Sequence, residues 1–364
     1  MNPLVQLHTL GQSFWYDNIR RTFLEDGTLQ QLIDSDGLRG MTSNPSIFEK
    51  AIGQSDDYDV QLRQLVADGA GAMDAYEAMA VADIQAACDI FAPLYAQSDQ
   101  GDGFVSLEVS PYLARDTAGT IVEAKRLFAA VNRPNLMIKV PATAEGIPAI
   151  ADILAAGINV NVTLMFSMNH YNAVAMAYMD GIGRWMATGG DPAQVSSVAS
   201  FFISRVDSAV DNALAGKGRD DLLGKTAVSN SRVVYQQFKS LFYGEKFAEL
   251  KAAGARPQRL LWASTSVKNP AYPDTRYIDE LIGAETVNTI PPATVDAFRD
   301  HGTAALTLED GIADAQVVLS DLDGLGIDLT AVTEKLQADG VDSFSKAFDT
   351  LLAVIEKRIA EFKG

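Results

Sequence analysis

One lysine, Lys139, lies in the middle of an apolar run, Asn135 to Thr143, that has the pattern of a buried strand. Lysine is rarely buried without a partner, and burial favours the neutral amine by lowering the pKa of the side chain. A neutral amine can attack a carbonyl carbon and form a Schiff base. The alternative is a side chain that reaches from the strand end to solvent. This segment alone allows both interpretations.

Polar side chains alternate with apolar ones in another strand-like run, residues 158–166. Successive side chains of a strand point to opposite faces, so Asn161, Thr163 and Met165 are expected on one face and Leu164 and Phe166 on the other. The apolar face is suited to packing against helices. The polar face predicts a strand that carries functional groups.

The same alternation places functional groups on one face of other strand-like runs. The residues concerned are Asp17, Glu108, Lys139, Ser200, Phe202 and Ser204, with Thr42 and Asn44 at the end of the second run. Acid, amine, amide and hydroxyl groups thus recur near the carboxyl ends of strands, where barrel enzymes build their active sites. Each residue alone also fits a hydrogen-bonded core layer, and Asp17 could cap a helix that starts near Asn18. A shared site accounts for all of them at once.

Eight strand-like runs alternate with helical patterns along the chain. They are Ser13–Asp17, Leu38–Ser43, Phe104–Val109, Leu136–Pro141, Ile158–Phe166, Val198–Val206, Leu260–Ser266 and Thr286–Ile290. Helical periodicity separates most of them, for example in residues 116–132 and 146–157, as repeated strand–helix units require. We therefore expect an α/β fold, a (β/α)8 TIM barrel, with extra helices inserted after strand two (residues 45–103) and at the C-terminus (residues 307–363). Seven or nine strands also fit the pattern.

Residues 1–364 are expected to form a single barrel domain, because no Pro-, Ser- or Gly-rich linker divides the chain. Two ordinary domains would also fit the length. The formal net charge of −18 argues against nucleic acids and anionic membranes as partners, and an anionic substrate would need a local group of cations. Because no leader-like or long unbroken apolar segment is evident, we expect a soluble, cytoplasmic protein.

Metal and thiol chemistry have little support in the sequence. His8, His170 and His301 lie far apart and share no spacing typical of metal ligands. The single cysteine, Cys88, belongs to an amphipathic helical pattern and is expected to be a packing residue. We therefore expect neither a metal nor another cofactor.

Six segments together resemble those of transaldolases. They are MTSNPSIF (41–48), DGFVSLEVSP (102–111), RPNLMIKVPAT (133–143), GINVNVTLMFS (157–167), SVASFFISRVD (197–207) and LLWASTSVKNP (260–270). Their order and spacing agree from Ser13 to Pro292, and the chain is most similar to the longer bacterial branch of the family. The resemblance implies a (β/α)8 barrel with an all-helical insert.

The resemblance also implies an activity. A transaldolase transfers a dihydroxyacetone unit from sedoheptulose 7-phosphate to glyceraldehyde 3-phosphate, giving erythrose 4-phosphate and fructose 6-phosphate in the non-oxidative pentose phosphate pathway. Lys139 would form the Schiff base with the C2 ketone of the donor. Asp17 would take the proton of the C4 hydroxyl as the C3–C4 bond breaks. Glu108 and Thr163 would position a water for making and breaking the Schiff base.

Substrate-binding residues are implied in the same way. Those that match groups around the dihydroxyacetone unit are Thr42, Asn44, Asn161, Ser200 and Phe202. Arg205, Ser266 and Lys268 match the phosphate site. Much of the family has arginine where this chain has Lys268, and lysine cannot make the same bidentate contact with phosphate.

Other functions remain open at this point. An aldolase that releases free dihydroxyacetone would use the same Schiff base. A metal-dependent barrel aldolase or isomerase fits less well, because the histidines are scattered. A sugar-phosphate-binding barrel without catalytic activity would differ in class. The sequence does not distinguish a monomer from a homodimer.

Overall fold

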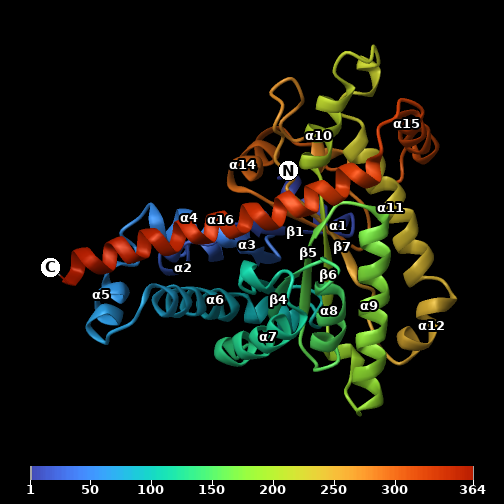
Figure 1. The fold of residues 1–364 in the computed structure, drawn as a ribbon. Coiled ribbons are helices and arrows are strands. Elements are labelled where there is room, and N and C mark those ends of the chain that lie inside the picture. Colours follow the sequence, from blue (N-terminus) through green and yellow to red (C-terminus); the bar gives the residue numbers. More distant parts are fainter. Residues whose placement is uncertain (1, 364) are drawn as a thin grey trace.

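The computed structural model describes residues 2–363 and contains one closed barrel of eight parallel strands in the order β1 to β8 (Figure 1). The strands are β1 (Gln12–Asp17), β2 (Gly40–Thr42), β3 (Phe104–Glu108), β4 (Leu136–Pro141), β5 (Val160–Met165), β6 (Ser197–Phe202), β7 (Arg259–Ala263) and β8 (Thr286–Ile290). Most strands are buried along their whole length, as expected of parallel strands whose outer faces are covered by helices. The prediction of an eight-stranded (β/α)8 barrel is confirmed.

Helices surround the barrel and alternate with its strands. They are α1 (Pro3–Thr9), α2 (Arg21–Glu25), α3 (Thr28–Asp36), α4 (Pro45–Gly53), α5 (Asp59–Ala67), α6 (Ala72–Gln97), α7 (Thr117–Val131), α8 (Gly146–Leu154), α9 (Met168–Ala187), α10 (Ser204–Leu214), α11 (Thr226–Phe242), α12 (Glu245–Ala252), α13 (Arg276–Asp279), α14 (Pro292–His301), α15 (Ile312–Gly324) and α16 (Leu329–Lys363). Three short 3-10 turns lie at Pro111–Leu113, Pro192–Gln194 and Asp220–Leu222.

Local sequence explains where the helices begin and end. The Asp116 side chain accepts a hydrogen bond of 3.0 Å from the Gly119 amide and so caps the start of α7, and Asn132 ends that helix in the left-handed conformation. Asn44 caps α4 in the same manner by accepting from the Ile47 amide at 3.0 Å. The helices expected over 116–132 and 146–157 are therefore present, as α7 and α8.

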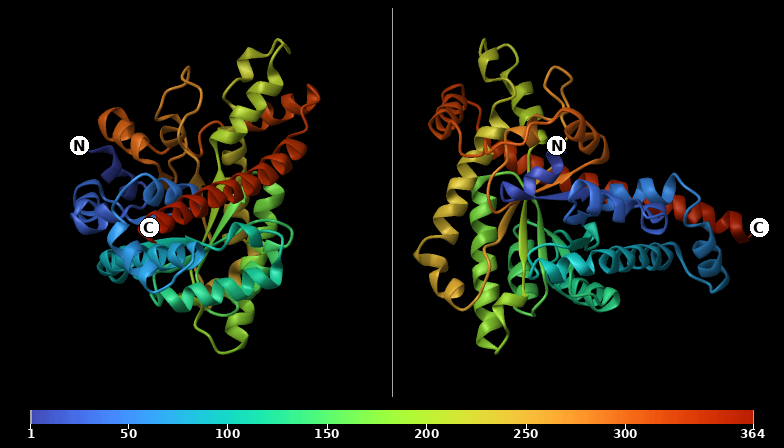
Figure 2. Two further views of the ribbon diagram at one scale, coloured as in Figure 1. Left: turned by 60° about the vertical axis from the view of Figure 1, so that its left-hand side comes forward. Right: turned by 180° about the vertical axis from the view of Figure 1, so that it is seen from behind.

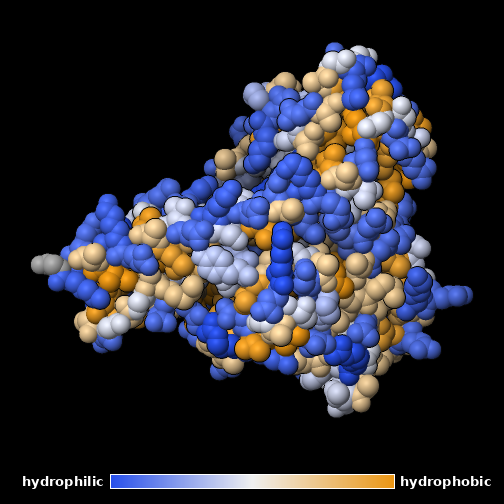
Figure 3. All heavy atoms as spheres, in the orientation of Figure 1, coloured by the Kyte–Doolittle hydropathy of each residue, from blue (hydrophilic) through white to orange (hydrophobic). Residues whose placement is uncertain are grey.

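The insert after β2 and the C-terminal helix form an extension to one side of the barrel. Helices α4, α5 and α6 belong to the insert, and α16 packs against all three of them and against α10 (Figures 1 and 2). The same helix therefore crosses the barrel and then follows the extension to its tip, where the C-terminus lies. Hydrophilic residues interrupt the apolar ones over most of the face in Figure 3.

By length and composition alone, α6 is the one helix within residues 2–363 that is apolar enough to cross a membrane. In the fold, however, it packs against β3, α7 and α16 and buries one face, including Met79, Ile84 and Cys88. These contacts are those of a core helix.

The ends of several predicted strands differ from the structure, and strands β6, β7 and β2 are examples. Strand β6 ends at Phe202 and α10 begins at Ser204, so Ser204 and Arg205 are helical and the strand expected to reach Val206 is too long. Strand β7 ends at Ala263, and the next residue has a φ of 57° that turns the chain away from the sheet. Leu38 and Arg39 precede β2. In each case the strand-like alternation extends beyond the residues that pair in the sheet, so periodicity alone misplaces the boundary.

A bulge in β5 corrects one predicted face. Val162 pairs with Ala199, but Met165 pairs with Phe201, so β5 holds one extra residue at this point. Leu164 has a φ of 59°, which few residues other than glycine adopt. The expected alternation therefore fails after Thr163, and Met165 shares its face with Phe201 rather than with the polar groups. A bulge of this kind changes the direction of the side chains next to a site.

Candidate active site

The register of the strands brings the predicted residues together at their carboxyl ends. Lys139 is paired with Glu108 on one side and with Asn161 on the other, and Asp17 is paired with Thr42. A cavity of about 390 Å³ opens at this end of the barrel. The predicted residues that line it are Asp17, Thr42, Asn44, Lys139, Ser200, Phe202, Arg205, Ser266 and Lys268. Glu108, Asn161 and Thr163 are buried behind this lining.

Lys139 is nearly enclosed, with its side chain only 6% exposed. Its Nζ atom donates a hydrogen bond of 3.2 Å to the Ser43 carbonyl oxygen and lies 3.6 Å from Glu108 Oε2. The Phe344 ring, from α16, has its centre 5.9 Å from Nζ. The snorkelling alternative therefore does not hold, because the amine ends inside the barrel and faces the cavity.

Glu108 is the carboxylate next to this amine, and it is buried to the same degree. Burial raises the pKa of Glu108 to about 7, although the attraction of Lys139 opposes this shift. Neither Glu108 oxygen has a hydrogen-bond partner in the described part of the chain, and the same is true of Thr163 Oγ1. Buried polar atoms usually have partners, so these free atoms are available to a water or to a substrate.

Asp17 lies on the other side of the cavity and has a different environment. Its Oδ1 accepts a hydrogen bond of 2.8 Å from Thr42 Oγ1, which in turn lies 2.6 Å from Thr289 Oγ1. Burial raises the pKa of Asp17, and Lys139 is the strongest opposing influence. The helix-cap alternative is wrong, because α2 begins at Arg21 and receives no side-chain cap.

Amide and hydroxyl groups form a short chain across the inner strands. Ser200 Oγ donates to Asn161 Oδ1 at 2.7 Å, and Asn161 Nδ2 donates to Ser106 Oγ at 3.0 Å. These bonds fix the orientation of the Asn161 amide and leave Ser200 at the cavity wall. Together with Asn44, they supply fixed polar contacts for hydroxyl groups of a bound molecule.

Three cations, Arg205, Lys268 and Lys50, line the outer part of the cavity. Arg205 lies over the Phe202 ring at 5.4 Å, and Lys268 donates a hydrogen bond of 2.6 Å to Ser266 Oγ. Burial lowers the pKa of Lys268, and the nearby charges of Arg205 and Lys50 lower it further. Within residues 2–363, none of the three cations forms an ion pair with an acid. In a chain of net charge −18, this group is a local site for an anion.

Sequence reasoning missed Lys50, Thr289 and Phe344, which also line the cavity. Lys50 lies on α4 and Phe344 on α16, so strand alternation gives no signal for either residue. Thr289 belongs to the predicted strand β8, whose alternation gives its place in the barrel but not its contact with Thr42. The prediction of extra C-terminal helices over residues 307–363 includes α16 but not its place over the barrel.

The other candidate metal ligands and nucleophiles lie apart from this cavity. Within residues 2–363, no group of three or more His, Cys, Asp or Glu side chains could hold a metal ion. His170 contacts Glu334, and His301 contacts Asp274 at the surface. Cys88 is buried in α6, where burial raises the pKa of its thiol.

In this parallel (β/α)8 barrel, a buried lysine lies between two carboxylates and beside cations that have no acidic partner. These features define a barrel enzyme suited to Schiff-base chemistry on anionic carbonyl compounds. The family model of transaldolase/fructose-6-phosphate aldolase matches residues 14–355, and the chain belongs to this family. It is 47% identical to a transaldolase of Thiobacillus denitrificans over 358 residues, covering 98% of this chain and 100% of that protein. It is 42% identical over 371 residues to one of Trichodesmium erythraeum, with 98% of each chain covered. Identity to one of Neisseria gonorrhoeae is 46% over 353 residues, covering 97% and 99%.

Proposed function

We propose that this protein is a transaldolase that acts as one catalytic domain in the cytoplasm. It transfers a dihydroxyacetone unit from sedoheptulose 7-phosphate to glyceraldehyde 3-phosphate, giving erythrose 4-phosphate and fructose 6-phosphate in the non-oxidative pentose phosphate pathway. The observation that carries the proposal is the buried Lys139 amine, which faces a cavity of about 390 Å³ that also holds unpaired cations. Membership of the transaldolase family supports the same reading.

Formation of the Schiff base begins when Lys139 Nζ attacks the C2 ketone of the donor. The resulting carbinolamine loses its hydroxyl group as water. Glu108, 3.6 Å from Nζ and with a pKa raised to about 7 by burial, supplies the proton for this step. The free hydroxyl of Thr163 helps to hold the water. The protonated imine then withdraws electrons from C3.

Cleavage requires a base at the C4 hydroxyl. Asp17 accepts this proton, the C3–C4 bond breaks, and its electron pair moves into the imine to form an enamine. The hydrogen bond from Thr42 keeps one Asp17 oxygen occupied and the carboxylate fixed. An aldose phosphate leaves, and a second one enters and reacts by the reverse steps. No net hydrolysis occurs.

Substrate binding divides between the inner and outer parts of the cavity. Asn44, Asn161 and Ser200 hold the hydroxyl groups of the dihydroxyacetone unit, with Phe202 as an apolar wall. Arg205, Lys268 and Ser266 bind the phosphate, because these groups lie together without an acidic partner. A lysine at position 268 acts here as a point charge next to the arginine.

A coupled assay tests this function against its nearest alternative, an aldolase that releases free dihydroxyacetone. With fructose 6-phosphate as donor, a transaldolase forms stoichiometric glyceraldehyde 3-phosphate and then stops until an acceptor such as erythrose 4-phosphate is added. Continuous release of free dihydroxyacetone without an acceptor would identify an aldolase. Binding of sugar phosphates with no turnover at all would identify a binding protein.

A further inference from the structure

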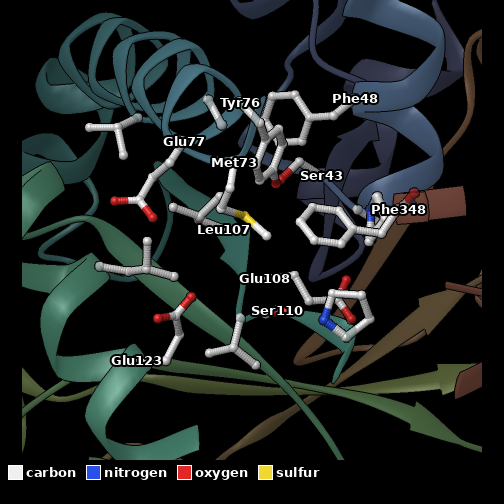
Figure 4. Close-up of a pocket in the computed structure, with 17 residues that line it drawn as sticks. Ser43, Phe48, Met73, Tyr76, Glu77, Leu107, Glu108, Ser110, Glu123 and Phe348 are labelled. Atoms are coloured by element: carbon white, nitrogen blue, oxygen red, sulfur yellow. The ribbon is translucent and has the colours of Figure 1, made fainter. Parts of the chain in front are cut away.

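A second, smaller hollow, lined by Glu108, lies between the barrel and the helical insert (Figure 4). Its volume of about 30 Å³ accommodates about one or two water molecules but no sugar. Its walls come from four helices and from β3, and they are largely apolar. The main wall residues are Phe48, Met73, Tyr76, Ala80, Leu107 and Phe348.

Glu108 lines this small hollow and does not line the substrate cavity, whereas Lys139 lines the substrate cavity only. The two side chains are only 3.6 Å apart at Nζ and Oε2. The amine thus lies on the sugar side and the carboxylate in the other hollow, and Asn44 lines both. Both Glu108 oxygens lack hydrogen-bond partners within residues 2–363. The Glu108 side chain is only 3% exposed.

The hollow extends from Glu108 toward the protein surface between α6 and α7. At its outer end lie Met73, which is 42% exposed, and the partly exposed carboxylates Glu77 and Glu123. Figure 4 shows Glu77 and Glu123 on the side opposite Phe348. Toward the substrate side, Tyr76 is packed edge-on between Phe48 and Phe348, with ring centres 5.8 and 5.1 Å away. These rings form a wall between the hollow and the region crossed by α16.

Schiff-base chemistry releases one water when the imine forms and takes up one water when it is hydrolysed. When the carbinolamine loses its hydroxyl, the C2–O bond breaks, the nitrogen lone pair forms the C=N bond, and the oxygen takes a proton from Glu108 and leaves as water. Hydrolysis reverses each change and consumes one water. With a sugar phosphate bound in the main cavity, water that left by that route would have to pass the bound substrate.

We propose that the small hollow is the route by which water reaches and leaves Glu108, separate from the mouth through which sugar phosphates enter. This inference rests on the roles proposed above for Lys139 and Glu108. Polar groups along the route support it, because Ser43 and Ser110 line the hollow beside Glu108. Tyr76 also lines the hollow, and burial, followed by the charge of Glu108, raises the pKa of its hydroxyl. A water in this space thus has the two or more polar partners that it requires.

Exchange of the ketone oxygen measures passage along this route. Fructose 6-phosphate labelled with ¹⁸O at C2 loses its label once in every cycle of imine formation and hydrolysis. The variants Ala80→Val, which narrows the hollow from within, and Met73→Trp, which covers its outer end, are expected to slow this exchange about tenfold. Ala82→Val is the matched control, because Ala82 lies on the same helix but does not line the hollow.

The expected pattern is slow exchange in the two hollow variants and wild-type exchange in Ala82→Val, with the equilibrium amount of trapped imine and the KM for fructose 6-phosphate unchanged. Wild-type exchange in both hollow variants would overturn the proposal, and Met73→Trp alone decides it if Ala80→Val does not fold. Glu108→Gln serves to separate the two proposals. If that variant exchanges the label at the wild-type rate, the role assigned to Glu108 fails, and the water route fails with it.

Discussion

The two carboxylates near Lys139 have different neighbours, and each neighbour set suits a different proton transfer. Neither Glu108 oxygen has a hydrogen-bond partner within residues 2–363, and burial raises the pKa of Glu108 to about 7. Asp17 accepts a hydrogen bond from Thr42 and faces the cavity across from the lysine. A group that donates a proton to a leaving hydroxyl must carry that proton first, and the raised pKa of Glu108 suits it to the proposed role.

Replacing each carboxylate by its amide should stop the reaction at a different stage. A general acid or base typically contributes ~10²–10⁴ in rate. In single-turnover borohydride trapping with fructose 6-phosphate, Asp17→Asn should form the adduct and retain all six carbons of the sugar, because cleavage is blocked. Glu108→Gln should form any adduct slowly. If both variants trap the adduct at the wild-type rate, the two roles are wrong.

The pH dependence of imine formation should report Glu108. Because the protonated carboxyl supplies the proton, the dehydration step should slow as the pH rises through about 7. The Gln variant cannot lose a proton, so this part of its profile should be flat, although its rate is low. A stopped-flow or quenched trapping series from pH 5.5 to pH 9, at about half-unit steps, tests the prediction. An unchanged limb near pH 7 in the variant would assign it to another group.

Removing one cation from the outer cavity should weaken the binding of phosphorylated substrates. A hydrogen bond to a charged group contributes about 1.5–3 kcal/mol, so Arg205→Ala and Lys268→Ala should lower kcat/KM for glyceraldehyde 3-phosphate by roughly 10- to 150-fold. Lys50→Ala should have a smaller effect in the same direction, because Lys50 is exposed. Unphosphorylated glyceraldehyde is the control substrate, and equal losses with both substrates would place the phosphate elsewhere.

At the scale of elements, the C-terminal helix and the bulge of β5 depend on each other. Gln337 of α16 donates hydrogen bonds of 2.9 Å to the Ala142 and Leu164 carbonyl oxygens, which lie at the ends of β4 and β5. Gly340, one turn further on, lies so close to Leu164 that an added Cβ atom would come within 2.8 Å of its side chain. These contacts hold α16 over the barrel and thereby bring Phe344 to the cavity.

Replacing Gln337 by leucine should destabilise the protein and disturb the site. The change keeps the approximate volume but leaves two buried carbonyl oxygens without their donor, at a cost of about 1–3 kcal/mol each. We expect a lower Tm and a lower kcat, measured by calorimetry and by the coupled assay. Asp342→Ala on the exposed side of the same helix is the control. If Gln337→Leu had wild-type Tm and kcat, α16 would be held by other contacts.

At the scale of the whole molecule, the sequence predicts what depends on short-range pattern. Strand alternation places Lys139, Glu108 and Asp17 at one end of one barrel because each strand's period is local and all eight strands run parallel. It fails at Leu164, where the bulge is stabilised by Gln337, a residue 173 positions away in the chain. Sequence patterns also do not find Phe344, because helix periodicity carries no information about which element the helix packs against.

At this scale the central proposal is that Lys139 is the reactive amine among three lysines at one cavity, and that assignment has the most direct test. Lys50 and Lys268 share the same cavity wall, so chemical access alone does not distinguish the three. Borohydride reduction in the presence of fructose 6-phosphate, followed by peptide mass spectrometry, identifies the amine that bears the sugar. We predict a reduced dihydroxyacetone unit on Lys139 alone, and no such adduct in Lys139→Arg, whose guanidinium stays charged. An adduct on Lys50 or Lys268, or continued transfer by Lys139→Arg, would contradict the proposed mechanism.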